Sequence, residues 1–344
     1  MFYIRILSKM MKRLLYIICC LISVHLHAQD PHFSQFFSSP LTLNPAYTGK
    51  FDGSIRIAGN YRNQWPSINN AYITQTGSVD FRILQNKINA NDIWGVGFMA
   101  LNDNSASGAV NYSYYSLSTA FHKGLDEDGL QQLGVGVQAT FSNMTINTSV
   151  LTFEDQLTNS GFTGITHETF NGQQLQSHYF DVNAGLLYSG GDGDGTNYYV
   201  GASLYHFTKP IQQFTNGATY FLNPRTTITA GGSFSVGQNI NLHLSGLQNI
   251  QGGASESILG GAFQFIATPD EVKPTSFYVG SWIRLGDAIM PYVGLEWDDF
   301  RIGASYDING SSLKTASQSQ GGIEVSLIYA YRSNPDKSIR CPKF

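Results

Sequence analysis

Long stretches of this chain alternate between apolar and polar side chains, and this alternation limits the fold more than any other feature of the sequence. In the last such stretch, Ile323, Val325 and Leu327 occupy one side while Glu324 and Ser326 occupy the other. A period of two places successive side chains on opposite faces of a β-strand. The pattern predicts about fourteen strands, near residues 54–63, 71–84, 93–102, 109–122, 131–143, 179–189, 196–206, 225–236, 239–250, 255–267, 275–286, 289–298, 300–309 and 321–332.

The length of these stretches separates two folds that both alternate in this way, a soluble β-sandwich and a membrane barrel. Most of the stretches run about ten residues or more, whereas strands of soluble sheets usually have about five or six. A tilted strand that crosses a membrane needs about 9 to 11 residues. The most apolar run after residue 28, Ile258–Ala267, is interrupted by two glycines and Gln264, so it does not suit a membrane-spanning helix.

We therefore predict an all-β fold, a transmembrane antiparallel β-barrel of about 14 strands, with twelve or sixteen strands as alternatives. An even number of strands leaves both termini on one side, as a closed barrel requires. Polar faces then line the lumen, because an Arg or Lys that faces lipid at the midplane would cost roughly 2 to 4 kcal/mol. The 19 Tyr, 22 Phe and 36 Gly also suit a barrel with aromatic girdles.

The first residues have the pattern of a secretory signal peptide. Lys12 and Arg13 precede the apolar run Leu14–Val24, and Ala28 follows at a plausible cleavage point. Translation from either Met1 or Met11 would give this leader. We expect cleavage near Ala28 and export of the remainder.

Charge and cysteine content limit the functions and the cross-links that the exported part can have. The leader holds basic and no acidic side chains, so its removal makes a chain of net charge −4 more negative, which argues against nucleic-acid binding. Of the 3 cysteines, Cys341 alone follows the leader. An internal disulfide is therefore excluded, and Cys341 is either an inert thiol or a site for an intermolecular bond.

The segment at residues 29–52 is punctuated by Pro31, Pro40 and Pro45, which predict an extended, irregular backbone. Its aromatic side chains would be left in water unless the segment folds inward. We expect an ordered segment that enters the lumen as a plug, with a periplasmic tether or packing along the rim as alternatives. The aromatic side chains expected to be buried there are Phe33, Phe36, Phe37 and Tyr47.

Charged side chains fall on the predicted inner faces of the strands. They form either a mutually paired ladder that fixes register or a polar interior that grips the N-terminal segment or a client peptide. The residues expected to face inward are Arg56, Arg62, Asp80, Arg82, Glu296, Asp298, Arg301, Asp307 and Glu324.

The connections between strands are of two kinds. Short turns at Gly237–Gln238, Gly286–Asp287 and Asp298–Asp299 suit the periplasmic side. Long connections at 144–178, 207–224 and 310–320 are expected to carry function, and we expect that they do not all lie on one side of the barrel. The candidate partner-binding residues in the longest loop are Phe153, Asp155, Phe162 and Phe170.

The sequence lacks the motifs of an enzyme or a metal site. The histidines after the leader lie in no GxSxG or HxxxH pattern. The run GGDGDGTN at 190–197 lacks the distal glutamate of a calcium-binding loop and is better explained as a hairpin turn. We expect no catalytic residue, no metal and no cofactor.

Several motifs resemble one known family. QDPHFSQF, LNPAYTG and YRNQW follow one another between residues 29 and 65, and NTSVLTFEDQLTNSGF, SHYFDVNAG and the closing IRCPKF extend the likeness along the chain. They resemble the PorP/SprF family of outer-membrane proteins of the Bacteroidetes type IX secretion system. The resemblance implies a role in protein secretion, surface anchoring or gliding motility.

The resemblance also implies partners. One would be the C-terminal signal domain of a secreted or surface-anchored client protein, and the others would be periplasmic components of the secretion system. Pro335 and Pro342 keep Phe344 out of the last strand, so a tail with Cys341 and Phe344 is expected in the periplasm. The alternative function is an outer-membrane channel or hydrophobic-solute transporter gated by the N-terminal segment. The expected divisions are a signal peptide (1–28), an N-terminal segment (29–52), an outer-membrane barrel (53–332) and a periplasmic tail (333–344).

Overall fold

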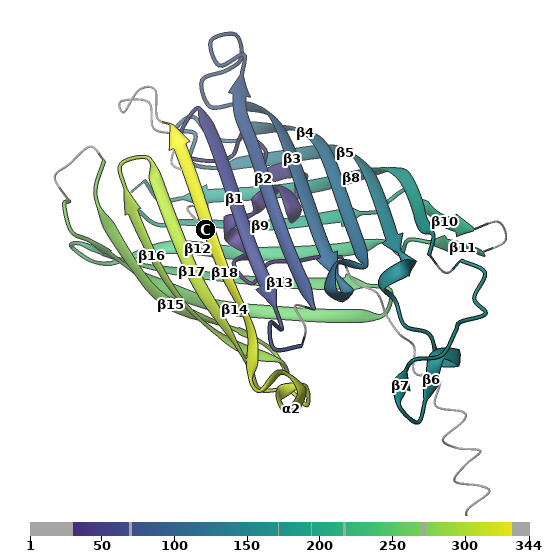
Figure 1. Ribbon diagram of the computed structural model, residues 1–344. Helices are drawn as coiled ribbons and strands as arrows, with labels where there is room; N and C mark the ends of the chain where they lie inside the picture. Colours follow the sequence, from purple (N-terminus) through teal and green to yellow (C-terminus); the bar gives the residue numbers. More distant parts are fainter. Residues whose placement is uncertain are drawn as a thin grey trace, which may run out of the picture.

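The strands close into a single barrel (Figure 1). The computed structural model describes residues 30–68, 71–170, 172–193, 195–215, 218–269 and 273–331. Neighbouring strands pair antiparallel, and β1 pairs with β18 to complete the ring, which confirms the predicted barrel. Its strands are β1 (Ile55–Gln64), β2 (Tyr72–Ile83), β3 (Ile93–Ser105), β4 (Val110–Gly124), β5 (Gln132–Asn147), β8 (Gln174–Gly191), β9 (Asn197–Tyr205), β12 (Arg225–Gly237), β13 (Ile240–Gln251), β14 (Ala254–Ile266), β15 (Ser276–Arg284), β16 (Ala288–Trp297), β17 (Phe300–Asn309) and β18 (Gln320–Tyr331).

The two faces of each strand differ as the alternation predicts. On β18, the side chains of Ile323 and Leu327 are 47% and 46% exposed, whereas Glu324 and Ser326 are buried. The exposed apolar face points away from the lumen, as lipid contact requires. Among the described residues, no helix has both the length and the apolar character needed to cross a membrane.

Two strands are longer than the sequence pattern predicted. β5 continues to Asn147 and β8 begins at Gln174, so the longest connection is 148–173 rather than 144–178. The ladder from Asn143↔His178 to Asn147↔Gln174 remains paired. Backbone hydrogen bonds continue here although the outward face is polar, with Asn143 and Thr145 opposite His178 and Gln176, and for this reason the sequence resembles a loop.

The barrel has two unlike ends. We call the end where β1 begins and β18 ends the turn end, and the opposite end the loop end. Strand order places all three long connections, 148–173, 206–224 and 310–319, at the loop end, so the expectation that they would not share a side is wrong. They contain η5 (Thr148–Val150), η6 (Glu154–Gln156), β6 (Leu157–Thr158), β7 (Gly161–Phe162), β10 (Ile211–Thr215), β11 (Ala218–Phe221) and α2 (Lys314–Ser317), which lie at the lower and right side of Figure 1.

The tight turns are shared between the two ends. The turns after β12 and β16 lie at the turn end, as expected. Gly286–Asp287 connects β15 to β16 and lies at the loop end, so its periplasmic assignment is wrong. That assignment used turn length alone, and it failed because short turns occur at both ends of this barrel.

A charge on the lipid-facing surface should destabilise the barrel according to depth. Val325 lies near the middle of β18 and Val236 near the end of β12, and both point outward. Val325→Arg should cost roughly 2 to 4 kcal/mol, against about 0 to 1 kcal/mol for Val236→Arg. The folded fraction in detergent, read from electrophoretic mobility without heating, should fall much further for Val325→Arg. Equal folded fractions would contradict the assigned lipid face.

Candidate functional site

The most distinctive feature inside the barrel is a segment that fills its lumen. We call residues 30–54 the lumen segment. It contains three short 3₁₀ turns, η1 (Phe36–Ser38), η2 (Pro40–Thr42) and η3 (Pro45–Tyr47). From residue 33 to residue 51 every side chain is buried except those of Phe37 and Tyr47, which are half-buried. In Figure 1 the segment is the dark purple coil inside the ring of strands.

The lumen segment runs from one end of the barrel to the other. At the loop end, the backbone N–H of Asp30 donates to Oε1 of Gln251, the last residue of β13, at 2.9 Å. At the turn end, the backbone N–H of Ser54 donates to the carbonyl of Tyr331, the last residue of β18, at 2.8 Å. The chain therefore enters the lumen at the loop end and reaches β1 only after crossing it.

The prolines act differently from the sequence prediction of an extended backbone. Pro40 and Pro45 begin η2 and η3, where a proline loses nothing because the first residue of a helical turn needs no N–H partner. Asn44 caps η3, since its Oδ1 accepts from Ala46 N at 2.8 Å. Its Nδ2 donates to the carbonyl of Leu186 on β8 at 2.9 Å. The prolines thus shape compact turns that are tied to the wall.

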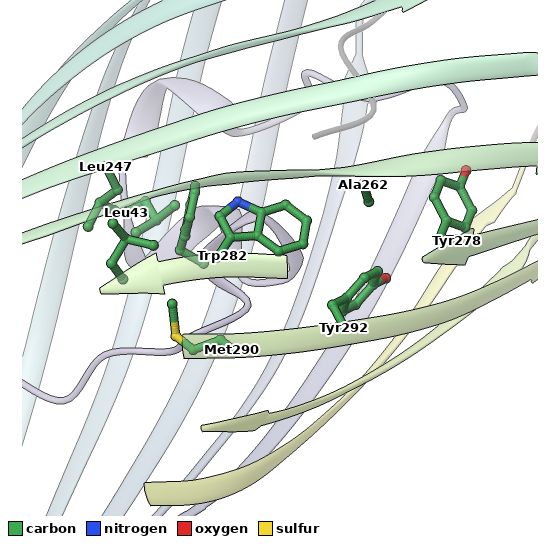
Figure 2. Packing of buried hydrophobic residues seen from close by; sticks show 9 residues of the cluster. Leu43, Leu247, Ala262, Tyr278, Trp282, Met290 and Tyr292 are labelled. Carbon is green, nitrogen blue, oxygen red and sulfur yellow. The ribbon is translucent and has the colours of Figure 1, made fainter. Parts of the chain in front are cut away.

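The four aromatic side chains singled out in the segment all lie against the barrel wall. Phe36 and Phe33 are buried, and the ring of Phe37 lies 4.6 Å from that of Trp282. Tyr47 shares a hydrogen bond of 2.9 Å with Thr229 on β12. Figure 2 shows the largest apolar cluster, in which Leu43 of the segment meets wall residues of β13 to β16. The wall residues labelled there are Leu247, Ala262, Tyr278, Trp282, Met290 and Tyr292.

Glycines on the wall make room for η3. A side chain at Gly136 on β5 would collide with the backbone of Pro45 and Ala46. At Gly185 on β8 it would collide with the side chain of Asn44. These strands therefore fit the lumen segment only because glycine is present where the segment comes closest.

Charged residues near the turn end hold the exit of the segment. Arg56 makes two hydrogen bonds of 2.9 Å to Asp80, one to each carboxylate oxygen, and Oδ2 of Asp80 also accepts from Gly49 N at 2.8 Å. Arg82 donates to the carbonyl of Gly49 at 3.0 Å and to that of Phe51. Arg56, Arg82 and Asp80 all face inward, and each contacts the segment.

A second group of charges, toward the loop end, grips the first part of the segment. Glu324 accepts from the backbone N–H of Ser34 at 2.7 Å and of Gln35 at 2.9 Å. Arg62 donates to the carbonyl of His32 at 2.5 Å and pairs with Asp307 at 3.1 Å. A ladder of paired charges and a polar interior that grips the N-terminal segment are therefore compatible interpretations. The same groups pair with one another and hold the segment.

One inner charge was misplaced by the sequence prediction. Glu296 and Arg301 pair inside the lumen at 2.9 Å. Asp298, in contrast, is exposed in the turn after β16 with a φ of 51°. The two-residue turn interrupts the alternation, so parity counted through it is not valid.

A buried histidine at the loop end was not recognised from the sequence. Nε2 of His206 lies 2.8 Å from Oδ2 of Asp30, and Nδ1 lies 2.8 Å from Oδ2 of Asp181. Arg225 approaches Asp30 at 3.4 Å. No sequence signal predicts this group, because Asp30 and His206 are 176 positions apart and fold together only when the segment enters the barrel.

The group shifts two pKa values in opposite directions. Burial by itself lowers the pKa of His206, but the Asp30 and Asp181 carboxylates outweigh burial and raise it to about 9. Burial likewise disfavours the charged form of Asp30, yet His206 and Arg225 hold the pKa of this carboxyl well below its usual range. His206 therefore ties the start of the lumen segment to the wall as a cation between two anions.

In the longest loop, the four candidate residues have different surroundings. The rings of Phe153 and Phe170 pack on each other at 5.6 Å, and Oδ2 of Asp155 accepts from His167 N at 2.6 Å, so these three shape the loop. Phe162 is 52% exposed. Leu157, which lies opposite Phe162 in the hairpin, and Ile165, three residues after Phe162, are also exposed, and we call these three side chains the hairpin patch.

Two predicted features belong to the ends of the chain. Cys341 and Phe344, with the tail 333–344, lie outside the described residues, as does the signal peptide. Within the described ranges, no group of three His, Cys, Asp or Glu side chains is placed to hold a metal ion.

Comparison with known protein families gives a match over most of the chain. A family profile described as type IX secretion system membrane protein PorP/SprF matches residues 26–329. A comparison with curated proteins found no match.

Three solved barrels have a similar overall shape at low identity. The Ralstonia pickettii toluene transporter TbuX is 9% identical over 86% of this chain and 94% of its own, with a TM-score of 0.48. The Pseudomonas putida toluene transporter TodX is 10% identical over 88% and 94%, with a TM-score of 0.47. A Pseudomonas aeruginosa FadL homologue is 11% identical over 84% and 93%, also with a TM-score of 0.47. Likeness at this level transfers no substrate to this chain.

Filling the space beside η3 should loosen the lumen segment without opening the barrel. Gly136→Val would overpack this contact at a cost of about 1 to 3 kcal/mol. Amide hydrogen exchange at Ala46 to Thr48 should then accelerate at least about fivefold, while exchange in the strands stays slow. Gly77→Val is the matched control, because a side chain at Gly77 meets nothing within 4 Å. Unchanged exchange at η3 would show that the close approach is unimportant.

The His206 anchor should be lost at high pH. A raised pKa in the folded state means that the stabilisation is complete below the ordinary value of 6.5 and disappears as pH rises through about 9. The thermal midpoint of the wild type should exceed that of His206→Gln at pH 6, and the gap should close toward pH 10. His178→Gln, at an exposed histidine, is the control. A gap independent of pH would rule out the charged pair.

Proposed function

This chain belongs to the PorP/SprF family of type IX secretion system membrane proteins, and from that premise we propose that it is a plugged, non-enzymatic outer-membrane adaptor. In this proposal its loop end holds the C-terminal signal domain of a secreted or surface-anchored client. Its turn end and tail contact periplasmic components of the secretion system. The barrel itself lies in the outer membrane.

The observation that carries this proposal is the lumen segment. It is buried along most of its length and is held at the turn end by Asp80 and Arg82 and at the loop end by Glu324 and His206. A lumen filled in this way leaves the two ends as the surfaces on which a partner can act. A channel, the alternative function, would require the segment to leave the lumen and expose these buried charges.

The distribution of loops supports the orientation of the adaptor. In outer-membrane barrels, long connections face outward and short turns face the periplasm. The three long connections share the loop end, so this end would meet a client at the cell surface. The hairpin patch there exposes Leu157, Phe162 and Ile165, and Ile165 is 85% exposed. Exposed apolar groups of this kind are typical of protein contacts.

The chemistry of His206 supports a non-enzymatic role. A general base must accept a proton from a nucleophile or water within hydrogen-bond reach. Both ring nitrogens of His206 already face carboxylates, and the hydroxyl of Thr208 donates to Asp181 at 2.9 Å. The group is therefore arranged to hold the segment in place.

Replacing the hairpin patch tests this function. A triple variant, Leu157→Ser with Phe162→Ser and Ile165→Ser, should remove most of the apolar contact area for the client. The intact outer-membrane complex would be purified from cells and the co-purifying proteins quantified by mass spectrometry. We expect client recovery to fall at least about tenfold.

The control places similar changes at the other end of the barrel. Leu84→Ser with Leu125→Ser removes exposed leucines at the turn end and should leave client recovery unchanged. Full client recovery with a folded triple variant would contradict the assignment of the client surface.

A further inference from the structure

A cavity of about 490 Å³ lies at the loop end, over the start of the lumen segment. Asp30, Pro31 and His32 form part of its lining, and strand ends and the 206–224 connection supply the rest. We call this cavity the vestibule. Its volume lies within the range of about 300 to 1,000 Å³ that is usual for small-ligand pockets.

Two acidic side chains line the vestibule. Its lining includes the carboxylates of Asp30 and Asp103 and no Lys or Arg among the described residues. Asp30 is already paired with His206 and Arg225. Asp103 is only 8% exposed, and within the described part of the chain it accepts one hydrogen bond, from the Thr74 hydroxyl at 2.5 Å, and has no ion pair. A carboxylate this buried would be stabilised by a cation placed in the vestibule.

The guanidinium of Arg62 forms its ion pairs with Asp307 and Glu324. Arg62 is engaged by Asp307 at 3.1 Å and by the carbonyl of His32 at 2.5 Å. His32 in turn pairs with Glu256 at 3.0 Å. The cationic side chains next to the vestibule therefore already pair with carboxylates, and Arg62 also bonds the backbone of the lumen segment.

Aromatic and amide side chains in the lining suit a peptide. Trp65 and Tyr72 meet edge to face at 5.6 Å, and their rings can receive the methylene stem and charge of a basic side chain. Trp65 holds a φ of 53°, a conformation that bulky residues rarely adopt and that is common at ligand clamps. Gln64 and Asn223 have side-chain amides without hydrogen bonds among the described residues, so they can bond a peptide backbone.

We propose that the vestibule binds a lysine or arginine side chain of an extended client segment, with Asp103 as its counter-ion and Trp65 and Tyr72 beside its stem. This inference rests on the proposed client-binding function and specifies its chemistry. The client would thereby meet the lumen segment directly, because Asp30 and His32 share the same cavity.

Binding of synthetic peptides to the full-length barrel in nanodiscs tests the inference. The probes are acetylated, amidated heptapeptides with a central lysine, arginine or norleucine between glycine and serine residues. Saturation-transfer NMR at fixed salt would give their affinities. We expect the lysine and arginine peptides to bind about tenfold more tightly than the norleucine peptide.

Asp103→Asn should abolish this preference. The substitution is close to isosteric and keeps an oxygen that can accept from Thr74, so the strand should fold normally. Asp126→Asn, in an exposed turn at the turn end, is the matched control and should preserve the preference. Equal binding of lysine and norleucine peptides, or a preference that survives Asp103→Asn, would overturn the inference.

Client recovery separates this inference from the function on which it depends. If Asp103→Asn lowers recovery of the client in the purification described above, the vestibule is part of the client site. If Asp103→Asn leaves recovery unchanged while the hairpin-patch variant loses the client, the vestibule inference fails and the adaptor function stands. If neither variant changes recovery, both are wrong.

Discussion

The structure depends on how the polar and charged side chains inside the barrel find hydrogen-bond and ion-pair partners. Each strand that shows an apolar face to lipid must place its alternate side chains in the lumen, and in this chain those side chains are largely polar or charged. A buried charge without a partner is costly. The lumen segment supplies the missing partners, since backbone N–H groups of Ser34, Gln35 and Gly49 reach the carboxylates of Glu324 and Asp80.

The direction in which the segment runs links this packing to function. β1 starts at the turn end, so a segment that merely led into it could have remained there. Instead Asp30 lies at the loop end, bonded to Gln251 and His206, and the chain returns through the lumen. Its first residues therefore line the vestibule on the side where the long connections gather. A partner bound at that end would contact wall, loops and segment together.

The sequence predicts the barrel but not the contacts inside its lumen. Alternation around Glu324 and Leu327 predicted which side chains face lipid, since that choice follows from periodicity alone. The inward direction of Arg56 and Arg62 followed from the same count. The partner of Asp30 did not, because His206 is close only in the folded chain. Likewise Gly136 has no sequence signal that separates a contact with η3 from an ordinary small residue in a strand.

Two errors have a shared physical origin. The sequence predicts an extended chain at Pro40 and Pro45, and it predicts loops at the polar ends of β5 and β8. Both predictions rest on the backbone conformation that the local sequence prefers. Contact with the lumen wall overrides it in the first case, and continued pairing between strands overrides it in the second.

Conductance across a planar lipid bilayer tests most directly whether the lumen segment closes this barrel. The intact purified chain should insert and give no large, steady current at moderate voltage, because the segment is anchored at both ends of the lumen. A large and steady current from the intact chain would contradict the account and favour an open channel.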